Sequence, residues 1–383
     1  MKKIAIVSKT FGNGGVEKAL VNMLKNIDYS TYQIDLYTPT VVLGVYPAQV
    51  KLIKMKTLIG NTEVRYFLLH PLQTIRASYV MFCNWINRNR SYEKQIIQNV
   101  WTYQKIKEKY DLAIAYDGPL GYSIFYTLSN IQAKKKYFWI HGSVKGDHVS
   151  DRVIEKYYSK YDKLVFVSES IKKEFDLLYP KMKEKTTFFY NFIDENVIYS
   201  KSKEMSKLKR LTGEIAITTV ARLSYEKGID IAIMAARLLR NKGLKFQWNI
   251  IGDGIQREKL EKQISDLKLQ GIVHMLGEKD NPYPYIKYCD IYVQPSRTEG
   301  YCTTTREAKI LCKPVIAFDV GGMREQFIDG QNGYLVKRED CEALVQTIYQ
   351  LAIDKQKREK IEDFLRKEYI ANDKQRLYTL LDE

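Results

Sequence analysis

The sequence predicts an α/β protein made of two Rossmann-like domains. Short apolar runs typical of buried strands alternate along the chain with stretches of helical spacing. The series of strand, glycine-containing loop and amphipathic helix begins at residues 3–8 and restarts at residues 215–220. Residues 199–213, rich in lysine and serine, separate the two series. We therefore expect a first domain at 1–195, a linker at 196–213, a second domain at 214–365 and a terminal helical segment at 366–383.

Length and composition restrict the class of protein. At 383 residues the chain favours two or three domains, and 45% apolar residues suffice for folded cores. No run is long enough to span a bilayer, and only four apolar residues follow Lys2 and Lys3, too few for a signal-peptide core. We expect a cytoplasmic protein. The five cysteines form no C-x-x-C pair, which argues against a disulfide framework and a zinc site.

The first domain is expected to carry functional residues where its strands end. A loop with Gly14 and Gly15 follows the first strand and lets a ligand approach the backbone, although a simple tight turn explains it equally well. Further strands are expected at 112–116 and 137–140, and Asp117 and His141 follow them directly. Ligands of open α/β sheets lie beyond the carboxyl ends of the strands, so His141 is a candidate site residue and Asp117 a weaker one.

Residues 51–110 interrupt the α/β pattern. They contain 11 Lys and Arg against 3 Asp and Glu, interleaved with aromatic residues, and predict mostly helices with a basic and aromatic face. Two interpretations remain open. In the first, the segment is a docking surface for a lipid-linked acceptor at an anionic membrane, and the protein is then peripheral on the inner face of the plasma membrane. In the second, the segment is a set of helices that pack on the sheet.

The second domain repeats the arrangement with charged loops. Arg222 and Lys227 lie in the loop after the strand at 215–220, so both can face one anion. Gly252 follows the strand at 246–251, and Glu278 follows the strand at 272–276, where residues 277–279 are expected to line a base pocket.

The most informative stretch is 295–308, PSRTEGYCTTTREA, in which seven residues separate Glu299 from Glu307. A buried strand is expected before it and a helix from Thr303 to Leu311 within and beyond it. The amides at the start of that helix have no partner inside it and favour an anion. Two carboxylates beside an anion site suit a ligand with hydroxyls at both ends and phosphate between them, as in a nucleotide-sugar. The expected donor-contacting residues of this stretch are Gly300, Tyr301, Cys302 and Thr303.

This stretch resembles the E-x7-E signature of retaining GT-B glycosyltransferases of family 4, the glycosyl transferases group 1, which assemble bacterial polysaccharides and glycolipids. The resemblance extends over further segments of the chain: Gly14-Gly15-Val16-Glu17, Asn191-Phe192-Ile193-Asp194, the pair Arg222 and Lys227, Val315-Ile316-Ala317, Gly321-Gly322, Glu325 and Asn332-Gly333. Cys302 and Cys312 stand where the family often has glycine, and Arg306 where an apolar residue is usual, which bears on the identity of the sugar.

The resemblance implies a GT-B fold, with two Rossmann-like domains facing across a cleft and a terminal helix that crosses back to the first domain. It implies a hexosyltransferase that moves a sugar from a nucleotide-sugar, with UDP as the commonest nucleotide, to a saccharide or lipid-linked saccharide with retention. Arg222 and Lys227 would hold the diphosphate, Gly15 would approach the phosphates, Glu299 would contact the sugar, Glu307 the ribose, and His141 would lie near the donor sugar.

The sequence also predicts that the reaction needs no metal or other cofactor. There is no D-x-D, and no His/Cys cluster has metal-ligand spacing, so protein cations must meet the leaving-group charge. Two other classes of protein agree with part of the sequence. A nucleic-acid-binding protein would agree with the net charge of +16, but no zinc-finger, RNP or helix-turn-helix pattern occurs. A non-catalytic partner subunit of the same fold would be expected to lack some of Arg222, Lys227, Glu299 and Glu307, and all four are present.

Overall fold

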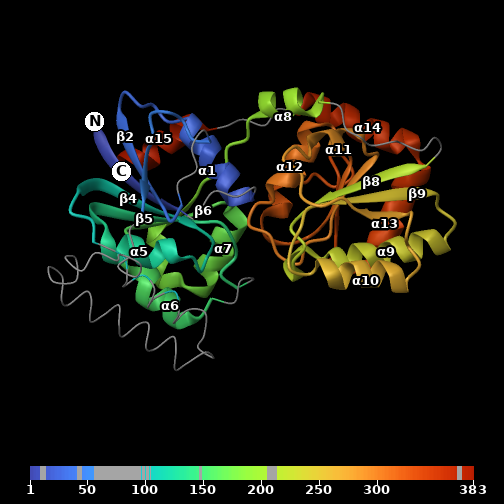
Figure 1. Cartoon of the computed structure of the whole chain (residues 1–383), viewed down its shortest axis with the longest axis horizontal. Helices are drawn as coiled ribbons and strands as arrows, with labels where there is room; N and C mark the ends of the chain where they lie inside the picture. The colour runs from blue at the N-terminus through green and yellow to red at the C-terminus, as the bar shows by residue number, and fades with distance from the viewer. Residues whose placement is uncertain are drawn as a thin grey trace, which may run out of the picture. The chain divides into compact units, whose positions relative to one another are not determined.

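The computed structural model of the chain contains two compact units (Figure 1). The first comprises Met1–Asn191 and Asp373–Glu383, and the second comprises Phe192–Asn372. The structure describes residues 1–8, 14–40, 45–55, 96, 100, 103, 105–145, 149–204, 214–368 and 373–383. Most of the segment 51–110, where a basic and aromatic helical insertion is predicted, lies outside the described residues.

The first unit is built on a seven-stranded parallel sheet of order β3-β2-β1-β4-β5-β6-β7. Its strands are β1 (Lys2–Ser8), β2 (Tyr32–Thr38), β3 (Lys51–Lys54), β4 (Lys109–Asp117), β5 (Gln132–Ile140), β6 (Lys163–Phe166) and β7 (Thr186–Phe188). The central strands are almost wholly buried, as expected for parallel strands covered on both faces. Because all of these strands run in one direction, their carboxyl ends form one edge of the sheet.

In the described part of the first unit, helices join β1 to β2, β4 to β5, β5 to β6 and β6 to β7, and they provide the crossover that a parallel pair requires. They are α1 (Gly15–Lys25), α5 (Tyr122–Asn130), α6 (Asp151–Tyr157) and α7 (Glu169–Leu178). In α1 the apolar residues at helical spacing, Ala19, Leu20, Met23 and Leu24, are the buried ones.

The terminal helix α15 (Lys374–Asp382) belongs to the first unit (Figure 1). The Tyr378 hydroxyl donates to the Asn26 carbonyl at 2.9 Å, and the Tyr32 hydroxyl donates to Asp382 at 2.7 Å. The rings of Tyr32 and Tyr378 also stack, with centroids 6.1 Å apart. These contacts join the end of the chain to its first strands.

One strand was not expected. Lys51–Lys54 forms β3, paired in parallel with β2, although the sequence at 51–110 predicted mostly helices. The strand has only four residues and a lysine at each end, both of them exposed. Such a short charged segment at a sheet edge carries no apolar run from which a strand could be recognised.

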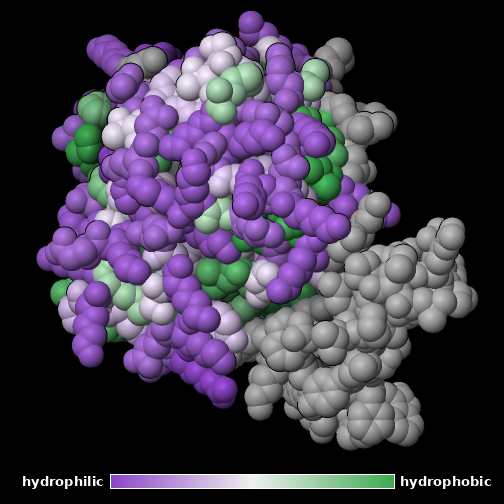
Figure 2. Space-filling model, turned by 90° about the vertical axis from the view of Figure 1, so that its left-hand side faces the viewer, coloured by the Kyte–Doolittle hydropathy of each residue, from purple (hydrophilic) through white to green (hydrophobic). Residues whose placement is uncertain are grey.

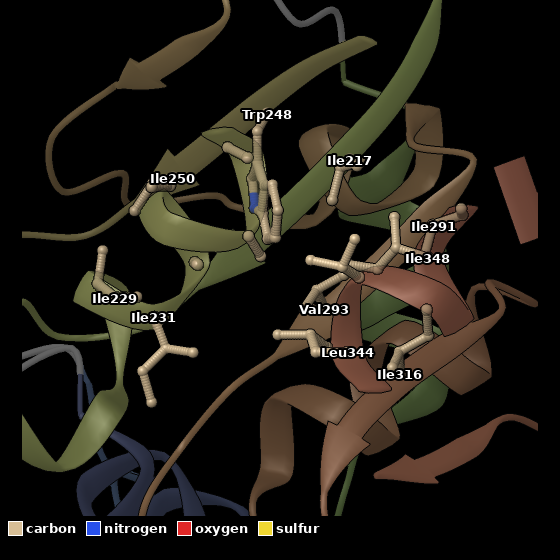
Figure 3. Packing of buried hydrophobic residues seen from close by; sticks show 14 of the residues in the cluster. Ile217, Ile229, Ile231, Trp248, Ile250, Ile291, Val293, Ile316, Leu344 and Ile348 are labelled. Carbon is tan, nitrogen blue, oxygen red and sulfur yellow. The ribbon is translucent and has the colours of Figure 1, made fainter. Parts of the chain in front are cut away.

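The second unit contains a six-stranded parallel sheet of order β10-β9-β8-β11-β12-β13. Its strands are β8 (Ile215–Val220), β9 (Phe246–Ile251), β10 (Val273–Met275), β11 (Ile291–Gln294), β12 (Val315–Phe318) and β13 (Tyr334–Val336). Figure 3 shows the core beside this sheet, where Trp248, Ile217 and Val293 pack near Leu344 and Ile348. The prediction of two parallel-sheet Rossmann-like units is therefore confirmed.

The helices of the second unit follow the predicted pattern, with one difference. They are α8 (Glu195–Ser202), α9 (Ile229–Asn241), α10 (Arg257–Asp266), α11 (Tyr283–Tyr288), α12 (Thr303–Ile310), α13 (Cys341–Ile353) and α14 (Lys355–Lys367). The difference is α8, which occupies the first part of the segment 196–213 expected as a linker. Asp194 caps it by accepting a hydrogen bond from the Val197 amide at 3.1 Å.

One face of the molecule is mainly polar (Figure 2). On the face seen in Figure 2, hydrophilic residues cover most of the described area and hydrophobic residues form small separate areas. Among the helices of the described residues, none combines the length and the apolar character that crossing a membrane requires.

Candidate functional site

The strongest candidate site lies at the carboxyl edge of the second sheet, beyond β8 and β11. These two strands are parallel neighbours, so the loops that follow them lie at the same edge. The loop after β8 leads through the 3₁₀ turn η3 (Tyr225–Lys227) into α9, and the loop after β11, residues 295–302, leads into α12. We call residues 295–302 the Glu299 loop.

Lys227 and Glu299 meet between these two loops. The Lys227 Nζ donates to Glu299 Oε1 at 2.8 Å, and the side chains are only 17% and 7% exposed. Burial is the largest single effect on the Lys227 ammonium and lowers its pKa, but the charge of Glu299, the hydrogen bond to Glu299 and the neighbouring Cys302 together outweigh burial, so the pKa is raised. Lys227 is therefore a permanent cation at neutral pH.

A chain of buried hydrogen bonds reaches Glu299 from the strand behind it. The Ser296 hydroxyl donates to the same Oε1 atom of Glu299 at 2.7 Å, and the Gln294 amide donates to Ser296 Oγ at 2.9 Å. Gln294 Oε1 in turn accepts from the hydroxyl of Tyr292 at 2.9 Å and from that of Thr304 at 3.3 Å. Sequence reasoning did not identify Gln294 or Ser296, because neither belongs to a charged pattern.

Two glycines in left-handed backbone conformations hold the Glu299 loop closely. Gly228 has φ +66°, and a Cβ atom there would lie 1.9 Å from the Pro295 carbonyl oxygen. Gly321 has φ +50°, and its Cβ would lie 1.9 Å from the carbonyl oxygen of Glu299. Gly321 begins the 3₁₀ turn η4 (Gly321–Gln326) after β12. Only glycine permits both the positive φ and the close approach to a carbonyl of the Glu299 loop. The loops that contain Gly228 and Gly321 therefore fix the backbone around Glu299.

Arg297 ties the same loop to its surroundings and was also missed from sequence. Its guanidinium bonds both carboxylate oxygens of Asp230, at 2.8 and 2.7 Å, and Glu339 Oε1 at 2.7 Å. It also donates to the Tyr225 carbonyl at 2.8 Å and lies 4.1 Å from the centroid of the Tyr225 ring. A bidentate arginine–carboxylate pair has a defined geometry, so Arg297 fixes the η3 turn that carries Lys227.

Arg222 is near this group but does not contact Glu299 in the structure. Its side chain is 72% exposed, and its Nη2 lies 3.5 Å from Glu226 Oε1. The Glu226 carboxylate also accepts a hydrogen bond from Ser224 Oγ at 2.6 Å. The charge of Arg222 lowers the pKa of Lys227, although burial and Glu299 have larger effects on it. The structure therefore pairs Arg222 with Glu226 and leaves most of its side chain exposed.

The start of α12 supplies backbone amides at the end of the Glu299 loop. Its N-cap residue, Cys302, has φ +51° and makes no side-chain capping bond. Thr303 begins the helix, the Gly300 carbonyl accepts from the Gly322 amide at 3.1 Å, and the Tyr301 carbonyl accepts from the Gln326 side chain. Burial raises the pKa of the Cys302 thiol to about 12, which leaves it protonated and a poor nucleophile at neutral pH.

Glu307 lies on α12 and is 5% exposed. Its Oε1 accepts a hydrogen bond from the Tyr283 hydroxyl, on α11, at 3.3 Å. Burial and the charge of Glu307 raise the pKa of Tyr283, so the phenol remains a hydrogen-bond donor at neutral pH.

Gly252 and Glu278 lie in two further loops at this edge of the sheet. Gly252 directly follows β9, and its amide donates to the Gly277 carbonyl at 2.9 Å. Glu278 follows Gly277 and is exposed. The structure therefore joins the two loops through their backbones.

The candidate residues of the first unit lie at the carboxyl edge of its own sheet. Gly14 is the N-cap of α1 and Gly15 its first residue. His141 directly follows β5, its ring lies 4.4 Å from that of Tyr116, and its Nε2 is buried without a hydrogen-bond partner among the described residues. Burial lowers the pKa of His141 to about 3, so its imidazole is neutral at physiological pH.

Asp117 has a structural role in the turn after β4. Its carboxylate accepts the Gly118 amide at 2.8 Å and the Ser123 hydroxyl at 3.0 Å. These bonds hold the turn between β4 and α5, and the residue is 1% exposed. In the part of the chain that the structure describes, no group of three or more His, Cys, Asp or Glu side chains is arranged to hold a metal ion.

Comparison with known proteins gives a family match within the second unit. Residues 200–368 match the family model described as glycosyl transferases group 1. An uncharacterized glycosyltransferase of Methanocaldococcus jannaschii is 31% identical over 217 residues, which are 53% of this chain and 56% of that protein. The poly(glycerol-phosphate) alpha-glucosyltransferase of Bacillus subtilis is 28% identical over 55% of this chain and 32% of that protein. The matched region therefore spans about half of the first relative and about a third of the second.

Among solved structures, Anabaena HepE in complex with UDP and glucose superimposes with a TM-score of 0.73, at 18% identity and with all of both chains covered. This likeness concerns the fold, which is the GT-B fold of two Rossmann-like units. The family match covers the charged loops, the Glu299 loop and α12. Residues 200–368, which make up most of the second unit, thus match the glycosyl transferases group 1 family.

Proposed function

We propose that the protein is a retaining glycosyltransferase that moves a hexosyl group from a nucleoside-diphosphate sugar, most simply a UDP-sugar, to a saccharide or lipid-linked saccharide in cell-surface polysaccharide assembly. The family match and the named glycosyltransferase relatives support transfer of a sugar. The complex of the structural neighbour HepE with UDP and glucose supports UDP as the nucleotide.

The observation that carries this proposal is the arrangement of Lys227, Glu299 and the start of α12 at one edge of the second sheet. Breaking the bond between the sugar and the phosphate leaves negative charge on the diphosphate. The buried Lys227 ammonium and the first amides of α12 can stabilise such charge without reorganising, and the exposed Arg222 guanidinium can turn toward it. Each contact of this kind contributes about 2–4 kcal/mol in the transition state.

The carboxylates have different tasks in the proposal. Glu299 Oε1 is occupied by Lys227 and Ser296, so Oε2 is the oxygen that would accept hydrogen bonds from the sugar hydroxyls and support positive charge on the ring. Glu307 would accept the two hydroxyls of the ribose, as a carboxylate can. His141, neutral because of burial, would hydrogen-bond the sugar and not transfer a proton as an imidazolium.

The reaction is proposed to need no metal, since protein groups already supply positive charge beside the expected diphosphate. The nucleotide is then held by the chain alone. An anionic membrane surface remains a proposed partner of residues 51–110. Flotation of the protein with liposomes that contain anionic lipid, compared with neutral liposomes, measures this interaction, and equal flotation would count against it.

The function is tested by incubating the protein with a panel of nucleotide-sugars and measuring both thermal stabilisation and release of the free nucleotide. One donor is expected to stabilise the protein and to be slowly hydrolysed, with faster nucleotide release when a saccharide acceptor is added. The anomeric coupling constant of the product, measured by NMR, then gives its configuration, which should equal that of the donor. Binding of a donor without any hydrolysis or transfer would instead favour a non-catalytic subunit.

A further inference from the structure

We propose that Ser296 and Gln294 are positioning residues, which fix the orientation of the Glu299 carboxylate and so decide which of its oxygens faces the donor sugar. This inference rests on the proposed function for its effect on transfer. Neither residue carries a charge, and neither is one of the two glutamates of the E-x7-E signature. Their role follows from how the hydrogen bonds around Glu299 are distributed.

Both hydrogen bonds that the described residues donate to Glu299 go to one oxygen. Lys227 Nζ lies 2.8 Å and Ser296 Oγ 2.7 Å from Oε1, and the two donors come from different loops. Two donors that converge on Oε1 restrict rotation of the carboxylate about its last bond. Oε2 accepts no hydrogen bond from the described residues and is left for a ligand.

Ser296 can play this part because its own hydroxyl is oriented. A hydroxyl has one proton and rotates freely unless a neighbour fixes it. Gln294 Nε2 donates to Ser296 Oγ at 2.9 Å, which directs the Ser296 proton away from Gln294 and toward Glu299. Ser296 is fully buried and Gln294 is 1% exposed, so water does not compete for these bonds.

The orientation of Gln294 is fixed in the same way. Its Oε1 accepts the Tyr292 hydroxyl at 2.9 Å, and Tyr292 is fully buried in β11. The donors therefore point in one direction, from Tyr292 through Gln294 and Ser296 to the carboxylate. Aligned hydrogen bonds polarise one another, and a buried network whose members are all satisfied is rigid.

The network also joins Glu299 to the helix that would bind phosphate. Thr304, in the first turn of α12, donates to Gln294 Oε1 at 3.3 Å. The sugar-facing carboxylate, the Lys227 ammonium and the first turn of α12 thus share one set of hydrogen bonds. Within this set, Ser296 and Gln294 provide the connection between Glu299 and α12.

Loss of the Ser296 hydroxyl should let the Glu299 carboxylate rotate, although the carboxylate itself stays in place. In Ser296→Ala, kcat is expected to fall about 10- to 100-fold, the cost of a misplaced catalytic group. The dissociation constant for UDP should change less than about threefold, because the hydrogen bond that Tyr283 donates to Glu307 does not involve Ser296. Gln294→Leu should act in the same direction and serves as a second variant if Ser296→Ala folds poorly.

A matched control exists in the neighbouring strand. The Thr219 hydroxyl, on β8, is also fully buried, donating to the Val293 carbonyl at 2.7 Å and accepting from the Trp248 indole at 3.0 Å. Thr219→Val removes a buried hydroxyl of the same sheet that contacts no carboxylate. Thr219→Val and Ser296→Ala are both expected to lower the melting temperature, because each removes a buried hydroxyl. In Thr219→Val, however, kcat should stay within about twofold of the wild-type value.

A double-mutant cycle separates positioning from general damage. If Ser296 acts through Glu299, the double variant Ser296→Ala/Glu299→Gln should have the same kcat as Glu299→Gln alone. If Ser296→Ala lowers kcat by the same factor in both backgrounds, the inference is wrong. The inference would also be wrong if Ser296→Ala had the same kcat as the wild-type protein.

A crystal structure of Ser296→Ala provides a readout that needs no activity. The Glu299 carboxylate is expected to rotate so that Lys227 no longer meets Oε1 in the same geometry. A carboxylate that keeps its orientation would contradict the inference even if turnover falls. If the wild-type protein neither binds nor hydrolyses any nucleotide-sugar, the proposed function fails, and this structure still decides whether Ser296 positions Glu299.

Discussion

Lys227 and Glu299 lie 72 positions apart in the sequence, yet their side chains form an ion pair of 2.8 Å at the edge of one sheet. The strands that precede them, β8 and β11, are neighbours, and the loops after parallel strands meet at the same edge. The pair places a permanent cation directly beside a carboxylate that has one oxygen left for a ligand.

Lys227→Ala should reduce turnover about 10- to 1,000-fold, because one charge contact to the leaving diphosphate is lost. It should also lower the free energy of unfolding by up to about 3 kcal/mol, since Glu299 stays buried without its cation. Initial rates and urea denaturation measure the two effects. The double variant Lys227→Ala/Glu299→Gln should regain part of the stability, and a double variant less stable than Lys227→Ala would contradict a pairing of the two residues.

Glu307→Gln should weaken binding of the free nucleotide about 10-fold or more, as a neutral amide replaces a charged acceptor of the ribose hydroxyls. Titration calorimetry with UDP measures this change. Tyr283→Phe is the matched control, because it removes only the hydroxyl that donates to Glu307. The control should weaken binding less than Glu307→Gln, and equal binding by wild type and Glu307→Gln would rule out the ribose contact.

Gly321→Ala should disturb the Glu299 loop, since the added Cβ would lie 1.9 Å from the Glu299 carbonyl oxygen. Gly243→Ala is a suitable control, because Gly243 also has a positive φ (+80°) and no atom lies within 4 Å of the position that an added Cβ would take. Both variants should lose about 1–2 kcal/mol of stability from the left-handed backbone. Only Gly321→Ala should also lose transfer activity, about 100-fold; equal activities would show that the loop tolerates displacement.

The buried imidazole of His141 should lower the free energy of unfolding as the pH falls below 6.5. Burial lowers its pKa from 6.5 to about 3, so the unfolded chain binds a proton that the folded chain excludes. This contribution to stability is complete above pH 6.5 and is lost progressively as the pH falls toward 3. Between pH 6.5 and 5 the loss amounts to about 2 kcal/mol. Urea midpoints at pH 7.5 and 5.0 should differ less in His141→Asn than in the wild type, and identical differences would place the acid sensitivity elsewhere.

Transfer should continue in the presence of EDTA, because the proposed charge stabilisation comes from Lys227, Arg222 and the α12 amides. The rate with excess chelator should lie within about twofold of the rate without it. A matched reaction with added Mg²⁺ provides the control. Complete loss of activity that a divalent metal restores would overturn the metal-free mechanism.

Much of the fold could be predicted because the signals are local. Strands β8, β9 and β11 are short apolar runs, and α12 begins at Thr303 as expected, so each is visible within a few residues. The prediction was wrong for β3 and for the first part of the linker at α8. Both are short polar segments, whose structure depends on the neighbours against which they lie.

The candidate site was predictable only as a set of charged residues. The spacing of Arg222 and Lys227, and of Glu299 and Glu307, indicated an anion beside two carboxylates. It did not indicate that Lys227 pairs with Glu299 while Arg222 lies 3.5 Å from Glu226. Arg297 was missed for the same reason, because its partners Asp230 and Glu339 are 67 and 42 positions away.

The sequence by itself determined the two series of strands and helices, the family signature and the types of side chain at the strand ends, since these follow from patterns a few residues long. Only the tertiary structure decided that Ser296 and Lys227 share one oxygen of Glu299 and that Gly228 and Gly321 enclose its loop. Those contacts depend on the order of strands in the sheet, because that order, and not distance along the chain, brings the loops after β8, β11 and β12 together.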